Sequence, residues 1–336
     1  MGYHRRTRIR ERHLMRNQSC VYHVVNRVAL GSMVLDEGAK GMFVQMMRRQ
    51  AGFAGVEVMA FCVMTNHFHL LVRVPEPCEI SDEELLRRYR ILYGKHCPQS
   101  MPQPDYLEQM LVEGDEDADE WRKRIVARMH DLSAFVGELK HRFSIWFNDH
   151  RHNKGTVWSE RFRSIIVEDL PEYTAPVAAY IDLNPVRAQM VDDPGEYAYS
   201  SYGSAMKGSR SAQYGLRSLY SGKRTWKVAL ESYRVLLFGK GYESKGTPHK
   251  DIGMIDPERA YQVIKDGGRL SWAEYLRMRV GYFSRGGALG SSEFIQGFHR
   301  GDSLPESDPP SGKGHRAKGV SDKFYSLRNL QKNVFG

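Results

Sequence analysis

Two histidines separated by one residue, His67 and His69, carry the first chemical signal in the sequence. They lie in the segment HFHLLVRV, whose density of apolar and β-branched residues predicts a β-strand. Because side chains alternate between the two faces of a strand, both imidazoles and Arg73 share one face, and the apolar residues between them share the other. Two imidazoles one strand repeat apart can bind a single metal ion. The pair alone is also compatible with two surface histidines.

A second signal is the pair formed by Tyr180 and Asn184 in the segment YIDLNPVR. Four residues apart on a predicted helix, they occupy one face. A tyrosine can act as a covalent nucleophile when it is activated or lies beside a metal-polarised electrophile. The amide oxygen of Asn184 suits Mg²⁺ or Mn²⁺ in the company of two histidines. The structural alternatives are a half-buried helix tyrosine and a residue that ends a helix, and Tyr173, seven residues earlier, is a second tyrosine for the same face.

A third signal is the stretch from Leu139 to Ser164, in which cations alternate with aromatic residues. Cations bind phosphates and exposed rings stack on unpaired bases, so this composition favours single-stranded or hairpin nucleic acid. Phe143 and Phe147 are expected in the core, given their four-residue spacing. We predict nucleic-acid contacts from basic residues of this stretch and of the neighbouring motifs, namely Arg27, Arg73, Lys140, Arg142, Arg161, Arg163 and Arg187.

The composition agrees with a polyanionic partner without proving one. The 336 residues include 49 Lys and Arg against 40 Asp and Glu, which gives a net charge of +9. The 41% of hydrophobic residues is enough for a packed core. No stretch approaches the roughly 18 apolar residues of a membrane span, and no secretory signal is expected. The four cysteines form no CxxC pair, so we expect reduced thiols in a cytoplasmic protein.

The elements that must position these residues follow from local patterns. Strands are predicted over Cys20 to Val28, twice within Val56 to Val74 with a break at Thr65-Asn66, and over Thr156 to Glu168. Helices are predicted over Asp36 to Gln50, Leu132 to Asp149 and Pro171 to Leu183, the last of them stopped by Pro185. The resulting order, β-α-β-β-α-β with an added helix, predicts an α+β, ferredoxin-like fold with an antiparallel sheet.

The domain organisation is predicted from shifts in composition. A basic arm (1–19) precedes the main domain (20–205), which contains a charged insertion at about 75–132. A largely helical extension (206–300) follows, with helices expected over Glu231 to Phe238 and Asp256 to Met278. A flexible tail (301–336) begins with a linker-like stretch from Gly301 to Gly319.

Taken together, the motifs resemble the single-tyrosine HUH transposases, in particular the branch of REP-associated tyrosine transposases. The segments that carry the resemblance are YHVVNR (Tyr22 to Arg27), FCVMTNHFHLLV (Phe61 to Val72), LKHRFSIWFN, VWSERFRS, AAYIDLNPVRA (Ala178 to Ala188) and EYAYSSY (Glu196 to Tyr202). They cover roughly residues 17 to 75 and 132 to 205. The combination of NHFHLLV with YIxxNPVRA is far more specific than the histidine pair alone.

The resemblance implies a metal-dependent endonuclease and strand transferase for single-stranded DNA, with hairpin-forming repeats as the target. His67, His69 and Asn184 would hold one Mg²⁺ or Mn²⁺ ion. Tyr180 would attack the phosphorus, leaving a 5′-phosphotyrosine linkage and a free 3′-hydroxyl that can later attack the adduct. The bound DNA would place the enzyme at the bacterial nucleoid, and a homodimer is left open.

Two alternatives to this function remain open at the level of sequence. The same fold can serve a non-catalytic nucleic-acid-binding regulator, and the two histidines can activate water in a metal-dependent nuclease. The chain also departs from the family pattern in its long acidic insertion, which we expect to cover or regulate the DNA groove. The region after Tyr202 is longer than in a minimal transposase of this kind, and the sequence assigns it no chemistry.

Overall fold

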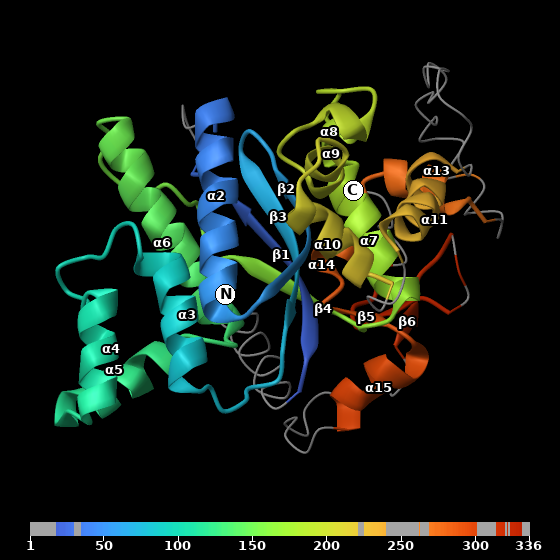
Figure 1. Ribbon diagram of the computed structural model, residues 1–336. Coiled ribbons are helices and arrows are strands. Elements are labelled where there is room, and N and C mark those ends of the chain that lie inside the picture. Colours follow the sequence, from blue (N-terminus) through green and yellow to red (C-terminus); the bar gives the residue numbers. More distant parts are fainter. Residues whose placement is uncertain are drawn as a thin grey trace.

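The fold is built on an antiparallel sheet. The computed structural model describes residues 18–29, 35–220, 225–239, 262, 269–300, 314–319, 321 and 323–330. The central strands are β1 (Cys20–Arg27), β2 (Glu57–Val63), β3 (His67–Val74) and β4 (Arg163–Val167), in the spatial order β2-β3-β1-β4 with antiparallel neighbours. With α2 (Glu37–Ala54) and α6 (Leu132–His150) as the crossover helices, the α+β, ferredoxin-like class is confirmed (Figure 1).

The turns between these elements place the histidines. Helix α2 begins after Asp36, whose carboxylate accepts the Ala39 N–H at 2.8 Å, and it ends at Gly55 in the left-handed conformation with φ 67°. The hairpin between β2 and β3 is closed by the Met64 N–H, which donates to the His67 carbonyl at 2.8 Å. The predicted break at Thr65-Asn66 is therefore correct, and His67 stands at the first position of β3.

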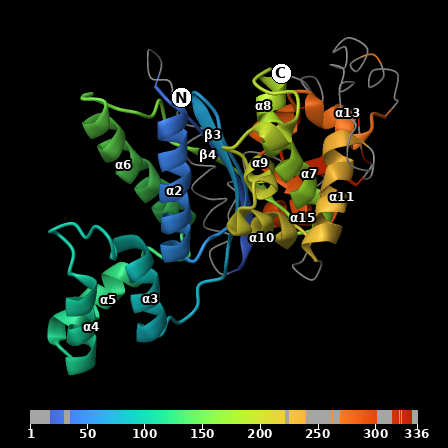
Figure 2. The same cartoon turned by 45° about the horizontal axis from the view of Figure 1, so that its top comes forward.

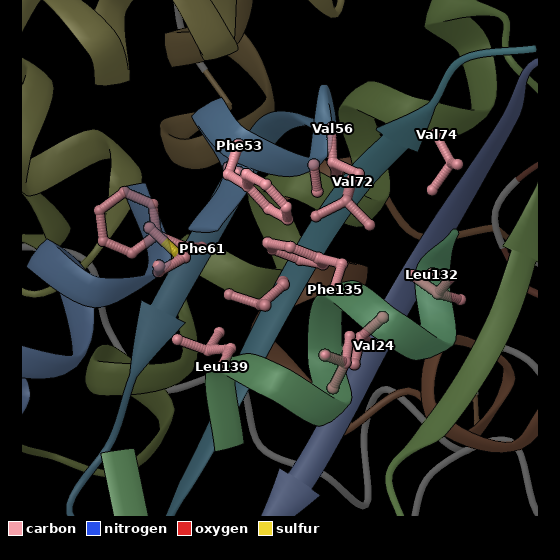
Figure 3. Packing of buried hydrophobic residues seen from close by; sticks show 14 of the residues in the cluster. Val24, Phe53, Val56, Phe61, Val72, Val74, Leu132, Phe135 and Leu139 are labelled. Carbon is pink, nitrogen blue, oxygen red and sulfur yellow. The ribbon is translucent and has the colours of Figure 1, made fainter. Parts of the chain in front are cut away.

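One face of the sheet packs against α2 and α6. Figure 3 shows Val24 and Val72 of the sheet facing Phe135 and Leu139 of α6, with Phe53 of α2 beside them. All five side chains are fully buried. The four-residue apolar spacing of α6 thus forms the core, as predicted, and Phe143 and Phe147 belong to the same cluster.

The other face is covered by the helices that follow β4. They are α7 (Pro171–Asp182), α8 (Asn184–Arg187), α9 (Ser201–Met206), α10 (Arg210–Ser218), α11 (Trp226–Phe238), α13 (Trp272–Arg277) and α14 (Gly281–Arg285). Figure 2 shows α7, α9, α10 and α11 on the side of the sheet opposite α2 and α6. Helix α7 ends at Asp182, close to the predicted end before Pro185. Pro185 lies in the first turn of the separate short helix α8, where its missing N–H is not needed.

The acidic insertion forms α3 (Asp82–Tyr93), α4 (Pro104–Glu113) and α5 (Glu116–Val126). Leu85 and Tyr89 of α3 are buried in the cluster that contains Phe53 of α2. The insertion therefore lies on the α2 side of the sheet (Figure 1). It does not cover the sheet face that carries His67 and His69, and a role in covering or regulating the DNA groove stays a prediction.

The C-terminal extension joins the sheet. Strand β5 (Ala288–Gly290) pairs in parallel with β4, and β7 (Tyr325–Ser326) and β6 (His315–Arg316) continue the sheet beyond it. Helix α15 (Ser292–Arg300) follows β5. The predicted flexible tail is thus wrong for the described residues beyond 313, where Phe324 and Ser326 are buried.

Two further predictions differ in their bounds. Strand β4 begins only at Arg163, although Trp158, earlier in the predicted strand, still pairs with Val28 in an isolated antiparallel bridge. The Trp158 indole N–H donates to the Ser144 hydroxyl of α6 at 2.9 Å. The predicted helix over 256–278 coincides with the structure only in α13 and at residue 262, and its other residues before 269 lie outside the described part. The basic arm up to residue 17 and the start of the predicted linker lie outside it as well. Within the described part, no helix is long and apolar enough to cross a membrane.

Candidate active site

The two histidines of β3 lie side by side at the strand end. Their ring centroids are 5.0 Å apart. His69 is buried with 5% of its surface exposed, whereas His67 is half-buried and reaches the surface. Val25 and Arg27 of β1 stand opposite His69 and His67 in the sheet, and so share their face. Both imidazoles therefore lie on one face of the sheet, as predicted. Most of that face is apolar and is buried under α7.

Each of these imidazoles has a hydrogen-bond partner at Nδ1. The Nδ1 atom of His67 lies 2.7 Å from the Asn66 side-chain oxygen. The Nδ1 atom of His69 lies 3.0 Å from Nε2 of His23, a fully buried residue of β1. Nδ1 of His23 in turn lies 2.7 Å from the carbonyl oxygen of Phe283 in α14. His69 and His23 thus form a hydrogen-bonded histidine chain that ends at the Phe283 carbonyl, and the His67 ring lies beside His69.

The environment keeps these rings uncharged near neutral pH. Burial lowers the pKa of His23 to about 4. Burial and the nearby cations Arg27 and Arg279 lower the pKa of His67 to about 4. Burial also sets the pKa of His69 well below its ordinary value, and the neighbouring imidazoles add to this effect. Neutral imidazoles have a free lone pair, which is the form that binds a metal ion.

Tyr180 of α7 packs directly against the histidine chain. Its ring centroid lies 6.3 Å from that of His69, 6.4 Å from that of His23 and 5.0 Å from that of Phe283. The alternative nucleophile Tyr173 faces the C-terminal segment, where its hydroxyl donates to the Lys323 carbonyl at 3.1 Å. The structure therefore brings Tyr180, and not Tyr173, to the histidines.

Asn184 follows Tyr180 by one helical turn. Its side-chain N–H groups donate to the carbonyls of Tyr180 at 3.3 Å and Ile181 at 3.0 Å. This orientation turns the amide oxygen away from those carbonyls and leaves it available as a ligand. Imidazole nitrogens and amide oxygens are both donor types that Mg²⁺ or Mn²⁺ accepts in proteins, so the side chains of His67, His69 and Asn184 suit such an ion by their chemistry. No group of three or more His, Cys, Asp or Glu side chains in the described residues offers a competing site.

Three of the predicted nucleic-acid contacts lie at the histidine end of the sheet. Arg163 of β4 stands opposite Val25, as His69 does from the other side, so it shares the histidine face. Its guanidinium donates to the Glu160 carboxylate at 2.9 Å. Arg27 and Arg161 are exposed. Together they give this end of the sheet a positive surface.

The other predicted contacts are engaged within the protein. Arg73 shares the histidine face but lies six residues from His67, where it forms ion pairs with Glu57 and Asp169. The Lys140 ammonium donates to the Glu160 carbonyl at 3.0 Å, and burial lowers its pKa to about 8.

Arg142 and Arg187 stack on tyrosine rings. The Arg142 guanidinium lies 4.9 Å from the ring centroid of Tyr93, in the insertion. The Arg187 guanidinium lies 4.0 Å from the Tyr180 ring. Arg187 therefore belongs to the candidate active site itself, and Arg142 lies on the opposite side of the sheet.

The residues that the sequence did not single out are His23, Arg187 as a neighbour of the tyrosine, Phe283 and Arg279. A signal for His23 existed, since a histidine inside the apolar strand motif YHVVNR needs a buried hydrogen-bond partner. Arg279 and Phe283 come from the C-terminal extension, and no local pattern connects them to the histidines.

Comparison with known protein families agrees with this geometry. Residues 16–102 match the model of a family described as IS200-like transposases. This segment is similar to that family, and we refer to it below as the IS200-like segment. The IS200-like segment contains β1, α2, β2 and β3, and therefore His23, His67 and His69, whereas Tyr180 and Asn184 lie beyond it. The predicted resemblance to a transposase family is confirmed over these residues.

A solved structure of a REP-associated tyrosine transposase bound to a REP hairpin is also similar to this chain. It is 14% identical, the match covers 57% of this chain and 81% of that chain, and the TM-score is 0.36. No curated protein matches the chain.

Proposed function

We propose that this protein is a metal-dependent single-stranded DNA endonuclease and strand transferase, a transposase that acts through Tyr180. The observation that carries the proposal is the contact between Tyr180 and the histidine chain, with ring centroids 6.3 Å apart for Tyr180 and His69. A nucleophile next to a pair of neutral imidazoles is the arrangement that metal-assisted transesterification requires. The IS200-like segment supports the transposase class.

The proposed reaction assigns a separate task to each side chain. The phenolic oxygen of Tyr180 attacks the phosphorus, forming an O–P bond while the bond from phosphorus to the 3′-oxygen breaks. The phenolic proton is lost, and the released 3′-oxygen leaves as a hydroxyl. A divalent ion, Mg²⁺ or Mn²⁺, held by His67, His69 and Asn184, would neutralise charge on the scissile phosphate. Attack of a 3′-hydroxyl on the phosphotyrosine reverses the step and joins the strands.

The positive end of the sheet supplies the DNA contacts in this proposal. Arg27 of β1 and Arg163 of β4 lie beside the histidines, and Arg161 lies two residues before β4. Arg279 approaches His67 from the C-terminal extension. Guanidinium groups pair with phosphate oxygens in bidentate geometry. A single strand or a hairpin flank that crosses this end would bring a phosphate to Tyr180, which is why we propose hairpin-forming repeat DNA as the substrate.

The test is denaturing gel electrophoresis after incubation with a labelled pool of hairpin-containing single-stranded DNA, with and without Mg²⁺ or Mn²⁺. The wild type should give a metal-dependent labelled protein band. Tyr180→Phe should lose that band, and the matched variant Tyr173→Phe should keep it. Cleavage without an adduct would instead identify a nuclease that uses water, and DNA binding without cleavage would identify a recognition module.

A further inference from the structure

The chain of hydrogen bonds behind His69 determines where that ring carries its hydrogen. A carbonyl oxygen only accepts hydrogen bonds, so the 2.7 Å contact to Phe283 requires the hydrogen of His23 to be on Nδ1. In the neutral ring, Nε2 of His23 is then an acceptor. The 3.0 Å contact to His69 must therefore be donated by Nδ1 of His69. This leaves the lone pair of His69 on Nε2.

The opposite arrangement would prevent metal binding. If His23 carried hydrogens on both nitrogens, Nδ1 of His69 would have to accept, and the His69 hydrogen would move to Nε2. Such a charged ring would be fully buried without a carboxylate partner among the described residues, which is costly. The neutral arrangement is the one that the environment favours.

His67 reaches the same tautomer by a different route. Its Nδ1 atom lies 2.7 Å from the side-chain oxygen of Asn66, which also only accepts. Nε2 of His67 is therefore free as well. Asn66 is exposed and adjacent in sequence, whereas His23 is buried and comes from another strand. Of the two ligands, only His69 depends on a distant part of the chain.

We infer that His23 is a positioning residue of the metal site, which holds His69 in the tautomer with Nε2 unprotonated and links it to the C-terminal extension through the Phe283 carbonyl. The inference rests on the proposed function for the metal ion, but the tautomer itself is a property of the metal-free protein. It gives the extension a chemical role, because the acceptor that orients the chain lies in α14, outside the IS200-like segment.

Two substitutions of His23 separate this role from simple packing. Glutamine has an amide N–H that can donate to the Phe283 carbonyl and an oxygen that can accept from Nδ1 of His69, so His23→Gln preserves both directions. His23→Leu fills the space with apolar atoms and leaves Nδ1 of His69 without a partner. Hydrogen-bond partners of metal-binding histidines are typically worth roughly 10- to 100-fold in metal affinity.

The first measurement is long-range ¹H–¹⁵N NMR of the histidine rings in the metal-free full-length protein. The ring signals lost in His23→Gln and in His69→Gln assign the two residues. We expect Nδ1 protonated and Nε2 unprotonated for His69 in the wild type and in His23→Gln, and population of the other tautomer in His23→Leu. A wild-type His69 with its hydrogen on Nε2 would overturn the inference without any variant having to fold.

The second measurement is Mn²⁺ affinity by electron paramagnetic resonance. His23→Leu should bind Mn²⁺ roughly 10- to 100-fold more weakly, and His23→Gln within a few-fold of the wild type. Equal losses of Mn²⁺ affinity in the two variants would mean that His23 contributes packing and not the orientation of His69. If the tautomer and affinities behave as expected but no phosphotyrosine adduct forms, the proposed function fails while the positioning role stands.

Discussion

The guanidinium carbon of Arg187 lies 4.0 Å from the centroid of the Tyr180 ring. The same guanidinium donates to the carbonyls of Tyr180 at 2.8 Å and Leu276 at 2.7 Å, and no carboxylate of the described residues forms an ion pair with it. Burial lowers the pKa of Arg187 from its ordinary value, yet the group stays cationic. Its charge is therefore fixed beside the proposed nucleophile, where it can stabilise negative charge that develops in the transition state.

Replacing Arg187 by methionine should slow cleavage without a comparable loss of DNA binding. Methionine keeps much of the side-chain length but removes the charge, and one fixed charge of this kind is typically worth about 10²-fold in rate. Single-turnover formation of the protein–DNA adduct measures the rate, and fluorescence anisotropy measures the binding. Arg187→Lys should retain part of the rate. Weakened DNA binding with an unchanged rate of adduct formation would instead mean that Arg187 binds DNA, as the sequence predicted, and does not assist the reaction.

The strand and helix order could be predicted because it depends on local patterns. The alternation of HFHLLVRV places His67 and His69 on one face whatever the rest of the chain does, and the turn before it is short. The helix that carries Tyr180 is likewise set by its own residues. These elements are sufficient to predict the class of fold and the placement of the two histidines and the tyrosine.

The partners of those residues could not be predicted, because they come from contacts distant in sequence. His23 and Phe283 are 260 residues apart, and Arg73 finds Asp169 across 96 residues. The sequence does not distinguish a basic residue that binds a phosphate of DNA from one that forms an ion pair with a carboxylate of the protein. Only the assembled sheet shows that Arg73 is paired with Asp169, and only the docking of the C-terminal extension shows that Arg279 lies near His67.

The tyrosine and the histidines should act within one chain. Their contact is made by α7 and β3 of the same molecule, with Tyr180 and His69 ring centroids 6.3 Å apart. Mixing the two inactive variants His67→Ala and Tyr180→Phe should therefore restore no adduct at any ratio. Adduct formation in the mixture, carried by the His67→Ala chain, would show that the tyrosine serves the metal site of another subunit.

DNA binding should weaken with salt, and the arginines at the histidine end should account for part of that dependence. Each phosphate neutralised in a single strand contributes a slope of about −0.7 to the logarithm of affinity against the logarithm of salt concentration. Arg27→Ala and Arg163→Ala should each flatten the slope by up to this amount. Arg142→Ala is the matched control, because Arg142 stacks on Tyr93 on the other side of the sheet. An equal change of slope in Arg142→Ala would mean that the DNA also contacts the side of the sheet that carries Arg142.

Asp182 should make the free energy of unfolding depend on pH through the packing of α7 against α11. Its fully buried carboxylate accepts hydrogen bonds from the Tyr233 hydroxyl at 2.6 Å and the Tyr202 N–H at 3.0 Å. Burial nevertheless raises its pKa from 3.8 to about 7.

Between these two pH values the folded protein holds a proton on Asp182 that the unfolded chain releases. The contribution of Asp182 to the free energy of unfolding is therefore complete below the lower value and is lost as pH rises through the higher one. Urea unfolding with a metal chelator in the buffer measures this at about pH 5 and about pH 8. From the lower to the higher pH, the free energy of unfolding of the wild type should fall relative to that of Asp182→Asn. The buried histidines titrate in both proteins and cancel in this difference, so a constant gap between the two would mean that Asp182 is ionised throughout.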